Sequence, residues 1–152
     1  MPDHRTPDGD IEFLFDGDIP PRVPEGCQYE LGFIRPETKW MFGNRQRLFL
    51  WFRILNPGEW FGRDLYMTCT VVADGKWRPS HKYFQAWVLA AGKRPNRRDR
   101  MSTAIFRNKV FRGKVRTVTK TSRQSLRTEE QQYSVIDELV GVLTGGDCQT
   151  CA

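Results

Sequence analysis

Long apolar runs and histidine are scarce in this sequence. It contains no stretch of about 18 consecutive apolar residues, so we expect no membrane-spanning helix and no membrane partner. The two histidines, His4 and His81, offer no readable Ser–His–Asp or Cys–His arrangement. Gly-rich phosphate loops of the P-loop or dinucleotide type are also missing. We therefore expect a binding protein rather than an enzyme of these classes.

Cysteine is also infrequent, with four residues in the chain. Cys148 and Cys151 form a C-x-x-C pair, but a structural zinc site needs four ligands at suitable spacing. We expect no metal site and no cofactor, and two free thiols instead. The acidic, polar start lacks the order of charged and apolar regions in a signal peptide. We expect a cytoplasmic protein with reduced thiols.

Charge is distributed unevenly along the 152 residues, whose formal net charge is +6. Residues 1–18 hold six acids and one arginine, which leaves 23 basic and 12 acidic residues elsewhere, a net charge of +11. An apolar fraction of 39% with 19 aromatic residues is typical of a folded chain. Its length favours one domain. The basic body indicates a polyanionic partner.

The first 26 residues contain five prolines, which oppose helices and central strands. We interpret residues 1–26 as an acidic N-terminal arm that includes the segment DIEFLFDGDIPP. This arm either lies extended along the domain or acts as an acidic-aromatic tail. Such a tail would dock on a partner or occupy the protein's own basic groove. We place the folded domain at residues 27–143 and expect a disordered tail over residues 144–152.

The stretch RLFLWFRI alternates in a way that predicts a strand with two different faces. One face is aliphatic and suits a core; its members are Leu48, Leu50, Phe52 and Ile54. The other face alternates arginines with aromatic rings; its members are Arg47, Phe49, Trp51 and Arg53. Exposed rings beside cations suit stacked bases and their phosphates. The alternative is a strand buried on both faces.

Further alternation predicts strands over residues 27–35, where Pro36 ends the strand, and over residues 62–72, where Tyr66 faces the same side as Trp51. A helix is predicted after Ser80, with Gly92 as its end, and we expect it to close one end of the core. The spacing of apolar residues over 134–143 predicts a short C-terminal helix, with a brief strand near Tyr133 as an option.

Basic residues gather in two later segments. The predicted loop over residues 93–100 carries four cations that we assign to phosphate contacts: Lys93, Arg94, Arg97 and Arg98. The predicted strand over residues 109–120 carries three on one face: Arg112, Lys114 and Arg116. Cations at alternate strand positions lie about 7 Å apart, comparable to the phosphate spacing of an extended single strand. A solvated surface loop is the alternative for residues 93–100.

Three strands, a helix and a basic strand, in that order, resemble the OB-fold, a five-stranded barrel. The matching residues are Phe52, Arg53, Ile54, Gly58, Gly62, Arg63, Leu65, Gly113, Lys114 and Val115. Over residues 27–140 the chain resembles OB-fold proteins of phages and plasmids that are related to single-stranded DNA-binding proteins. The resemblance implies a mainly β, OB-like barrel with a helix between strands three and four. The acidic-aromatic segment lies near the start of this chain, whereas that family carries an acidic tail at its end.

These patterns predict a protein that binds single-stranded DNA with little sequence preference, in replication, recombination or transfer of a mobile genetic element. An RNA-binding or protein-interaction module is one alternative. A Mg²⁺-dependent nuclease is another, with Glu37 and Lys39 as an E-x-K pair and Asp16 or Asp18 upstream. Exposed strand edges permit a homo-oligomer.

Overall fold

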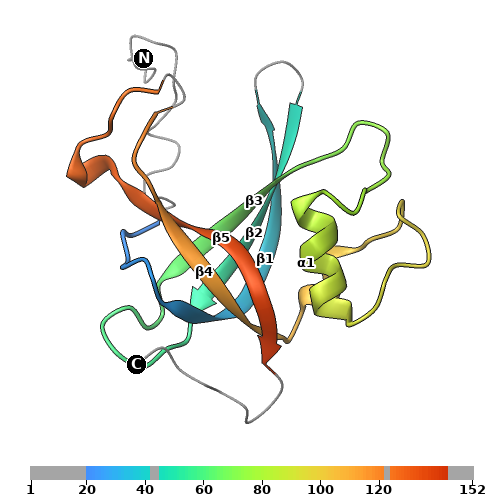
Figure 1. The fold of residues 1–152 in the computed structure, drawn as a ribbon, viewed down its shortest axis with the longest axis horizontal. Helices are drawn as coiled ribbons and strands as arrows, with labels where there is room; N and C mark the ends of the chain where they lie inside the picture. Colours follow the sequence, from blue (N-terminus) through green and yellow to red (C-terminus); the bar gives the residue numbers. More distant parts are fainter. Residues whose placement is uncertain (1–19, 42–44, 122–123, 144–152) are drawn as a thin grey trace, which may run out of the picture.

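The computed structural model describes residues 20–41, 45–121 and 124–143. These residues form one five-stranded antiparallel sheet and a single α-helix (Figure 1), so the protein is mainly β as predicted. The strands are β1 (Gln28–Met41), β2 (Arg45–Ile54), β3 (Asp64–Thr70), β4 (Val110–Val118) and β5 (Tyr133–Leu143), and the helix is α1 (Lys82–Ala91). Two short 3₁₀ helices, η3 (Thr103–Phe106) and η4 (Glu129–Gln131), precede β4 and β5.

The strands follow the order β3-β2-β1-β4-β5 across the sheet, so β3 and β5 form its edges. No backbone ladder joins these two edges among the described residues. They approach through side chains, since the ring centroids of Tyr66 and Tyr133 lie 6.4 Å apart. The sheet is therefore open, and a closed barrel is not confirmed.

The hydrophobic core lies between the inner face of the sheet and α1. The aliphatic face predicted for β2 is confirmed, because Leu48, Leu50, Phe52 and Ile54 are all buried. Residues 48–52 are buried without interruption, so β2 matches the alternative of a strand that is buried on both faces. The core also contains Leu31, Leu65, Met67, Tyr83, Phe84, Phe106, Phe111 and Ile136. α1 ends at Gly92 as predicted, with the glycine in the left-handed conformation at φ 73°. Its N-cap is His81, one residue after the predicted Ser80.

β1 is longer than predicted, because Pro36 does not end it. The strand continues to Met41, with an irregularity in its pairing with β2 between Phe33 and Arg35. β4 pairs with residues 28–32 of β1, and the Phe33 N–H donates to the Lys109 carbonyl just before β4, so from Arg35 onward β1 pairs with β2 alone. A proline fits there, since an edge position does not require every backbone N–H to be bonded.

The predicted C-terminal helix is wrong, because residues 133–143 form strand β5, paired with β4. Two register shifts in this pairing, one on each side of the Gly113–Lys114 pair, interrupt the strict alternation of β5. The apolar residues therefore recur at intervals that mimic a helix. The β-branched residues Val135, Ile136 and Val140 favour a strand over a helix.

The described part of the N-terminal arm packs along β5. The Val23 N–H donates to Ser134 Oγ at 2.8 Å, and the Ser134 N–H donates to the Pro21 carbonyl at 3.0 Å. Val23 is buried in the core. Residues 20–26 thus lie extended along the domain, whereas residues 1–19 and the predicted tail over residues 144–152 lie outside the described residues.

Candidate nucleic-acid interface

Four aromatic rings from three strands form a cluster on the outer face of the sheet. We call this cluster the aromatic shelf, and its members are Phe49 and Trp51 of β2, Tyr66 of β3 and Tyr133 of β5. The Tyr66 ring lies edge-on to both neighbours on β2, with its centroid 5.0 Å from that of Phe49 and 5.0 Å from that of Trp51. The sequence had predicted the association of the first three rings but not the contribution of Tyr133.

Three cations lie over the rings of the shelf. The Arg35 guanidinium is 5.0 Å from the Trp51 ring centroid, and Lys39 Nζ is 5.2 Å from that of Phe49. The Arg127 guanidinium is 5.4 Å from the Tyr133 ring centroid. We call these three residues the cationic cover. Such contacts are favourable because the negative face of an aromatic ring attracts a cation.

The strand register explains how the cover is built. Arg35 of β1 pairs with Trp51 of β2, and the alternating Glu37 and Lys39 follow on the same face of β1. Glu37 Oε1 accepts a hydrogen bond from Trp51 Nε1 at 3.3 Å and lies 3.6 Å from Lys39 Nζ. Glu37 of the E-x-K pair in the nuclease hypothesis therefore bonds to the Trp51 indole and forms an ion pair with Lys39. Its proposed partners Asp16 and Asp18 lie outside the described residues.

The expectation of open rings on this face is wrong for two residues. Phe49 is 8% exposed and Trp51 is 4% exposed, because neighbouring rings and cations cover them. Tyr66 is half-buried, and its burial together with the neighbouring Tyr133 raises the pKa of Tyr66. A base can therefore reach the inner rings only if a cation of the cover moves.

The two arginines that flank these rings on β2 differ in their surroundings. Arg47 is exposed near the start of β2. Arg53, at the other end of β2, bonds Asp64 through Nε at 2.9 Å and Nη2 at 3.3 Å, which raises the pKa of Arg53. Arg47 is thus available for a phosphate, whereas Arg53 is already paired with a carboxylate.

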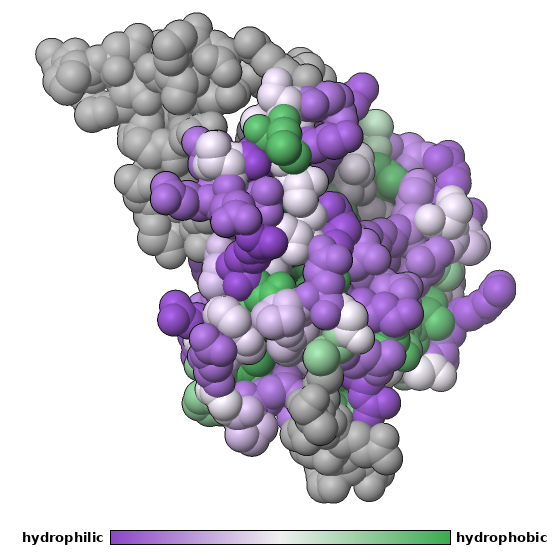
Figure 2. All heavy atoms as spheres, turned by 60° about the vertical axis from the view of Figure 1, so that its left-hand side comes forward, coloured by the Kyte–Doolittle hydropathy of each residue, from purple (hydrophilic) through white to green (hydrophobic). Residues whose placement is uncertain are grey.

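The predicted cationic face of β4 exists but is partly neutralised. Lys114 and Arg116 are exposed, and Arg112 is half-buried. β5 places acids beside two of them: Glu138 lies 3.5 Å from Lys114 Nζ, and Asp137 lies 3.3 Å from Arg116 Nε. Figure 2 shows a predominantly hydrophilic surface on the side of the molecule that carries the β4–β5 connection.

The basic segment over residues 93–100 lies apart from the shelf. It connects α1 to η3, on the right-hand side of Figure 1, whereas the β4–β5 connection that contributes Arg127 lies at the upper left. Arg97 pairs with Asp99 at 2.8 Å, and the Arg98 carbonyl accepts from the Trp77 N–H at 3.1 Å. Lys93, Arg94 and Arg98 have exposed side chains. The structure therefore does not bring this segment together with the rings.

Sequence reasoning missed several residues near the shelf. Arg35 and Lys39 continue the alternation of β1, but a prediction that ends this strand at Pro36 does not include Lys39. Arg127 and Tyr133 reach the shelf only through the tertiary fold, so no local signal predicts them. Trp40, at the hairpin end of β1, is 71% exposed.

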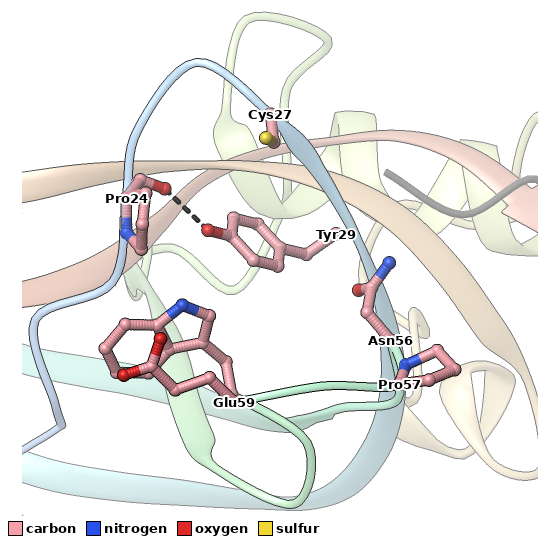
Figure 3. A pocket seen from close by; sticks show the side chains of 7 residues that line it. Pro24, Cys27, Tyr29, Asn56, Pro57 and Glu59 are labelled. Atoms are coloured by element: carbon pink, nitrogen blue, oxygen red, sulfur yellow. Dashed lines mark hydrogen bonds between the residues drawn. The ribbon is translucent and has the colours of Figure 1, made fainter. Parts of the chain in front are cut away.

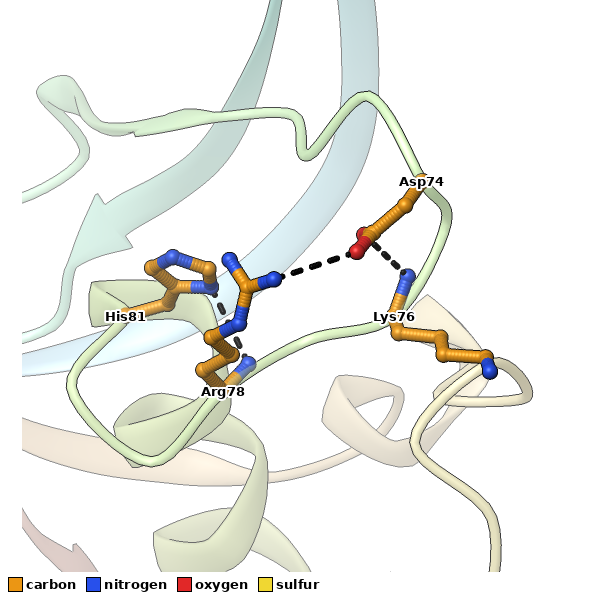
Figure 4. A network of polar contacts seen from close by, with 4 residues as sticks. All are labelled: Asp74, Lys76, Arg78 and His81. Atoms are coloured by element: carbon orange, nitrogen blue, oxygen red, sulfur yellow. Dashed lines mark hydrogen bonds and ion pairs between the residues drawn. The ribbon is translucent and has the colours of Figure 1, made fainter.

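The connection between β3 and α1 is stabilised by its own polar contacts (Figure 4). The Asp74 carboxylate accepts from the Lys76 N–H at 3.0 Å, which lowers the pKa of Asp74, and pairs with Arg78 at 3.2 Å. The Arg78 N–H donates to His81 Nδ1 at 3.0 Å. His81 therefore has a local structural role at the start of α1.

Within the described part of the chain, no three His, Cys, Asp or Glu side chains gather in a group suited to a metal ion. No helix in this part is long and apolar enough to cross a membrane. Comparison with protein-family models, curated proteins and solved structures finds no match.

Proposed function

We propose that this protein binds single-stranded nucleic acid, with single-stranded DNA as its ligand, on the aromatic shelf and its cationic cover. The observation that carries this proposal is the placement of Arg35, Lys39 and Arg127 over a continuous cluster of rings. Side chains of this kind bind the two parts of a nucleotide, since rings and guanidinium planes stack with bases and cations contact phosphates.

The topology supports an OB-like architecture for this proposal. The strand order β3-β2-β1-β4-β5, with α1 between β3 and β4, is the order of an OB barrel opened between its third and fifth strands. OB-folds are partly open barrels that bind oligonucleotides on the face of strands two and three and on the loops after strands one and four. The shelf occupies β2 and β3, while Lys39 and Arg127 come from the two corresponding hairpins.

The buried state of the inner rings defines a binding sequence with two steps. Phosphates first approach the cationic cover and the exposed Arg47. Arg35 or Arg127 then turns from its ring to a phosphate, and a base takes its place on the ring or stacks on the guanidinium plane. Each base–ring stack contributes about 1–3 kcal/mol, which is enough to offset the lost cation–π contact of about 0.5–1 kcal/mol. Because any base can stack, we propose little sequence preference.

A titration with labelled oligo-dT, followed by fluorescence anisotropy, tests this function. We expect the Arg35→Ala and Arg127→Ala variants to bind about threefold to tenfold more weakly, since each loses a phosphate contact and a stacking plane. Arg97→Ala is the matched control, because Arg97 lies in the segment that is remote from the shelf, and we expect it to bind like the wild type.

Matched RNA and duplex competitors refine the ligand class in the same assay. Preferential displacement by single-stranded DNA would support the proposal. Displacement by duplex DNA at equal concentration would contradict it, as would wild-type affinity in the Arg35→Ala, Arg127→Ala double variant.

A further inference from the structure

Two loops beside α1 bring together a second group of basic side chains. One belongs to the connection from β3 to α1 and the other to the connection from α1 to η3, and both lie on the right-hand side of Figure 1. The Trp77 N–H donates to the Arg98 carbonyl at 3.1 Å, so the two loops are in contact. We call residues 74–78 and 93–100 the basic loops. They hold seven basic and two acidic residues, a net charge of +5.

The acids of the basic loops leave most of these cations without a partner. Asp74 pairs with Arg78 at 3.2 Å, and Asp99 pairs with Arg97 at 2.8 Å. The other five cations are exposed and form no ion pair in the described part of the chain; they are Lys76, Lys93, Arg94, Arg98 and Arg100. Figure 4 shows the Lys76 side chain pointing away from the Asp74 carboxylate. These five cations are therefore available for an anionic ligand.

The basic loops offer cations but no fully exposed aromatic or large apolar side chain. Their one ring, Trp77, is half-buried and packs against Tyr83, with ring centroids 4.4 Å apart. The exposed large apolar residues of the described chain lie elsewhere; they are Trp40, Met41, Phe61 and Leu126. Protein interfaces have an apolar, aromatic core, and single strands bind to stacking rings. A surface of cations alone instead fits the phosphate backbone of a duplex, whose bases are stacked inside.

One end of the aromatic shelf leads directly to the basic loops. β3 carries Tyr66 of the shelf and ends at Thr70, which pairs with the exposed Arg47 of β2. The chain then enters the connection to α1, which contains Lys76. A nucleic-acid strand that leaves the shelf beside Arg47 therefore continues towards the basic loops.

The opposite end of the shelf carries no such charge. Residues 53–64, which include the β2–β3 connection, hold two basic and two acidic residues. A pocket at this end is lined by Pro24, Tyr29 and Glu59 among others (Figure 3), and Glu59 is the one charged residue among the described residues that line it. Because a carboxylate repels phosphates, charge assigns the continuing DNA to the end with Arg47.

We propose that the basic loops bind the phosphates of a DNA duplex whose single-stranded extension occupies the aromatic shelf. The ligand is then a junction between duplex and single-stranded DNA, and this inference rests on the proposed function for its single-stranded half. A duplex carries one charge per about 1.7 Å of its axis, about twice the density of either strand, which suits a compact group of cations. Three of the five cations are arginines, whose guanidinium groups bind phosphates through two parallel hydrogen bonds.

Fluorescence anisotropy with three labelled DNAs tests the proposal: an oligo-dT, the same oligo-dT as the overhang of a duplex, and the duplex with blunt ends. We expect the overhang DNA to bind at least about tenfold more tightly than oligo-dT, and the blunt duplex to bind more weakly than the overhang DNA. Because each duplex phosphate contact adds about −0.9 to the salt slope, the five cations should steepen the slope for the overhang DNA by about 4.

The Arg94→Ala, Arg98→Ala double variant tests the loops directly. The bond between the two loops uses the Arg98 carbonyl, so the variant retains it. We expect about tenfold weaker binding of the overhang DNA, a salt slope shallower by about 2, and unchanged affinity for oligo-dT. The Arg94→Lys, Arg98→Lys variant should retain most of the affinity. Arg63→Ala, which removes an exposed cation of the β2–β3 connection, is the matched control and should bind both DNAs like the wild type.

The junction proposal is overturned if the Arg94→Ala, Arg98→Ala variant binds the overhang DNA like the wild type, or if the wild type binds overhang DNA and oligo-dT equally. It is also overturned if a longer oligo-dT gains the same affinity and loses it in this variant, because the basic loops would then hold a single strand. Failure of the proposed function is a different result, in which the Arg35→Ala, Arg127→Ala variant binds oligo-dT like the wild type.

Discussion

Gly113 of β4 lies close to the Leu31 side chain of β1 and to the backbone of β5. A Cβ atom at this position would lie 2.6 Å from Leu31 Cδ1 and 3.2 Å from the Glu138 carbonyl oxygen. Gly113→Ala should therefore lower the free energy of unfolding by about 1–3 kcal/mol, because Leu31 is fully buried and has little room to shift. Urea denaturation measures the change. Gly141→Ala on β5 is the matched control, since nothing lies within 4 Å of its added Cβ, and an equal loss in both variants would contradict the explanation.

Tyr66 of β3 faces Tyr133 of β5 across the gap between the two edges of the sheet, with ring centroids 6.4 Å apart. Removing the Tyr66 hydroxyl in Tyr66→Phe removes its polar interaction with Tyr133, which helps to raise the pKa of Tyr66, but keeps the ring that contacts Phe49 and Trp51. We expect a loss of about 1 kcal/mol in the free energy of unfolding and an almost unchanged affinity for oligo-dT. A double-mutant cycle with Tyr133→Phe should show non-additive losses. Strict additivity would show that the two hydroxyl groups do not interact.

Individual residues of the shelf could be predicted from sequence only in part. The alternation of β2 correctly placed Leu48 and Leu50 in the hydrophobic core and Phe49 and Trp51 outside it. It could not show that Phe49 and Trp51 are buried, since their cover depends on Arg35 and Lys39 of β1 and on Tyr66 of β3. Burial on the outer face of a sheet depends on the tertiary structure, so the sequence of one strand does not predict it.

At the level of secondary structure, the two halves of β1 differ in the number of strands that pair with them. Residues around Leu31 have β2 and β4 as neighbours, whereas residues 35–41 pair with β2 alone. Amide hydrogen exchange followed by mass spectrometry should therefore be faster in residues 35–41 than around Leu31. Adding oligo-dT should slow exchange in residues 35–41 and around Arg127. Protection confined to residues 93–100 would instead place the nucleic acid on the remote basic segment.

The same elements show why some boundaries could be predicted and others could not. α1 and β2 have uninterrupted periodicity in the sequence, so their bounds agree with the predicted ones to within one or two residues. β5 pairs with β4 through two register shifts, which erase its alternation, and its apolar spacing then imitates a helix. β1 continues through Pro36 because its second half lacks a neighbour on one side, and this absence is a property of the whole sheet.

For the whole molecule, buried acidic groups predict a loss of stability at high pH. Burial raises the pKa of the Cys69 thiol to about 12 from 9.0, and burial also raises the pKa of Tyr83. These groups hold their protons more tightly when folded, so their contribution is complete below about pH 9 and is lost as the pH rises towards the folded pKa. Lys82 acts in the opposite direction, since burial lowers its pKa.

The free energy of unfolding should therefore fall by roughly 1–2 kcal/mol between about pH 8 and about pH 10.5. Urea denaturation across this range measures it. Cys69→Ala should reduce the pH dependence, because burial raises the pKa of this thiol. A wild-type curve that is flat over this range would contradict the assignment.

The salt dependence of oligonucleotide affinity reports how many cations of the whole molecule contact phosphates. Four cations, Arg35, Lys39, Arg47 and Arg127, lie at the shelf. Log affinity should therefore fall against log salt with a slope of about −3. Participation of Arg112, Lys114 and Arg116 would steepen the slope to about −5. We expect the shallower value, because Glu138 and Asp137 already pair with two of these three β4 cations.

The cationic cover has a further consequence for the protein without a bound ligand. Arg35 and Lys39 conceal the ring faces that would otherwise adhere to the same faces of another copy. They also give this surface a like charge that repels its counterpart on an approaching molecule. The side chains that would bind a nucleic acid thus disfavour self-association of the unbound protein through the aromatic shelf.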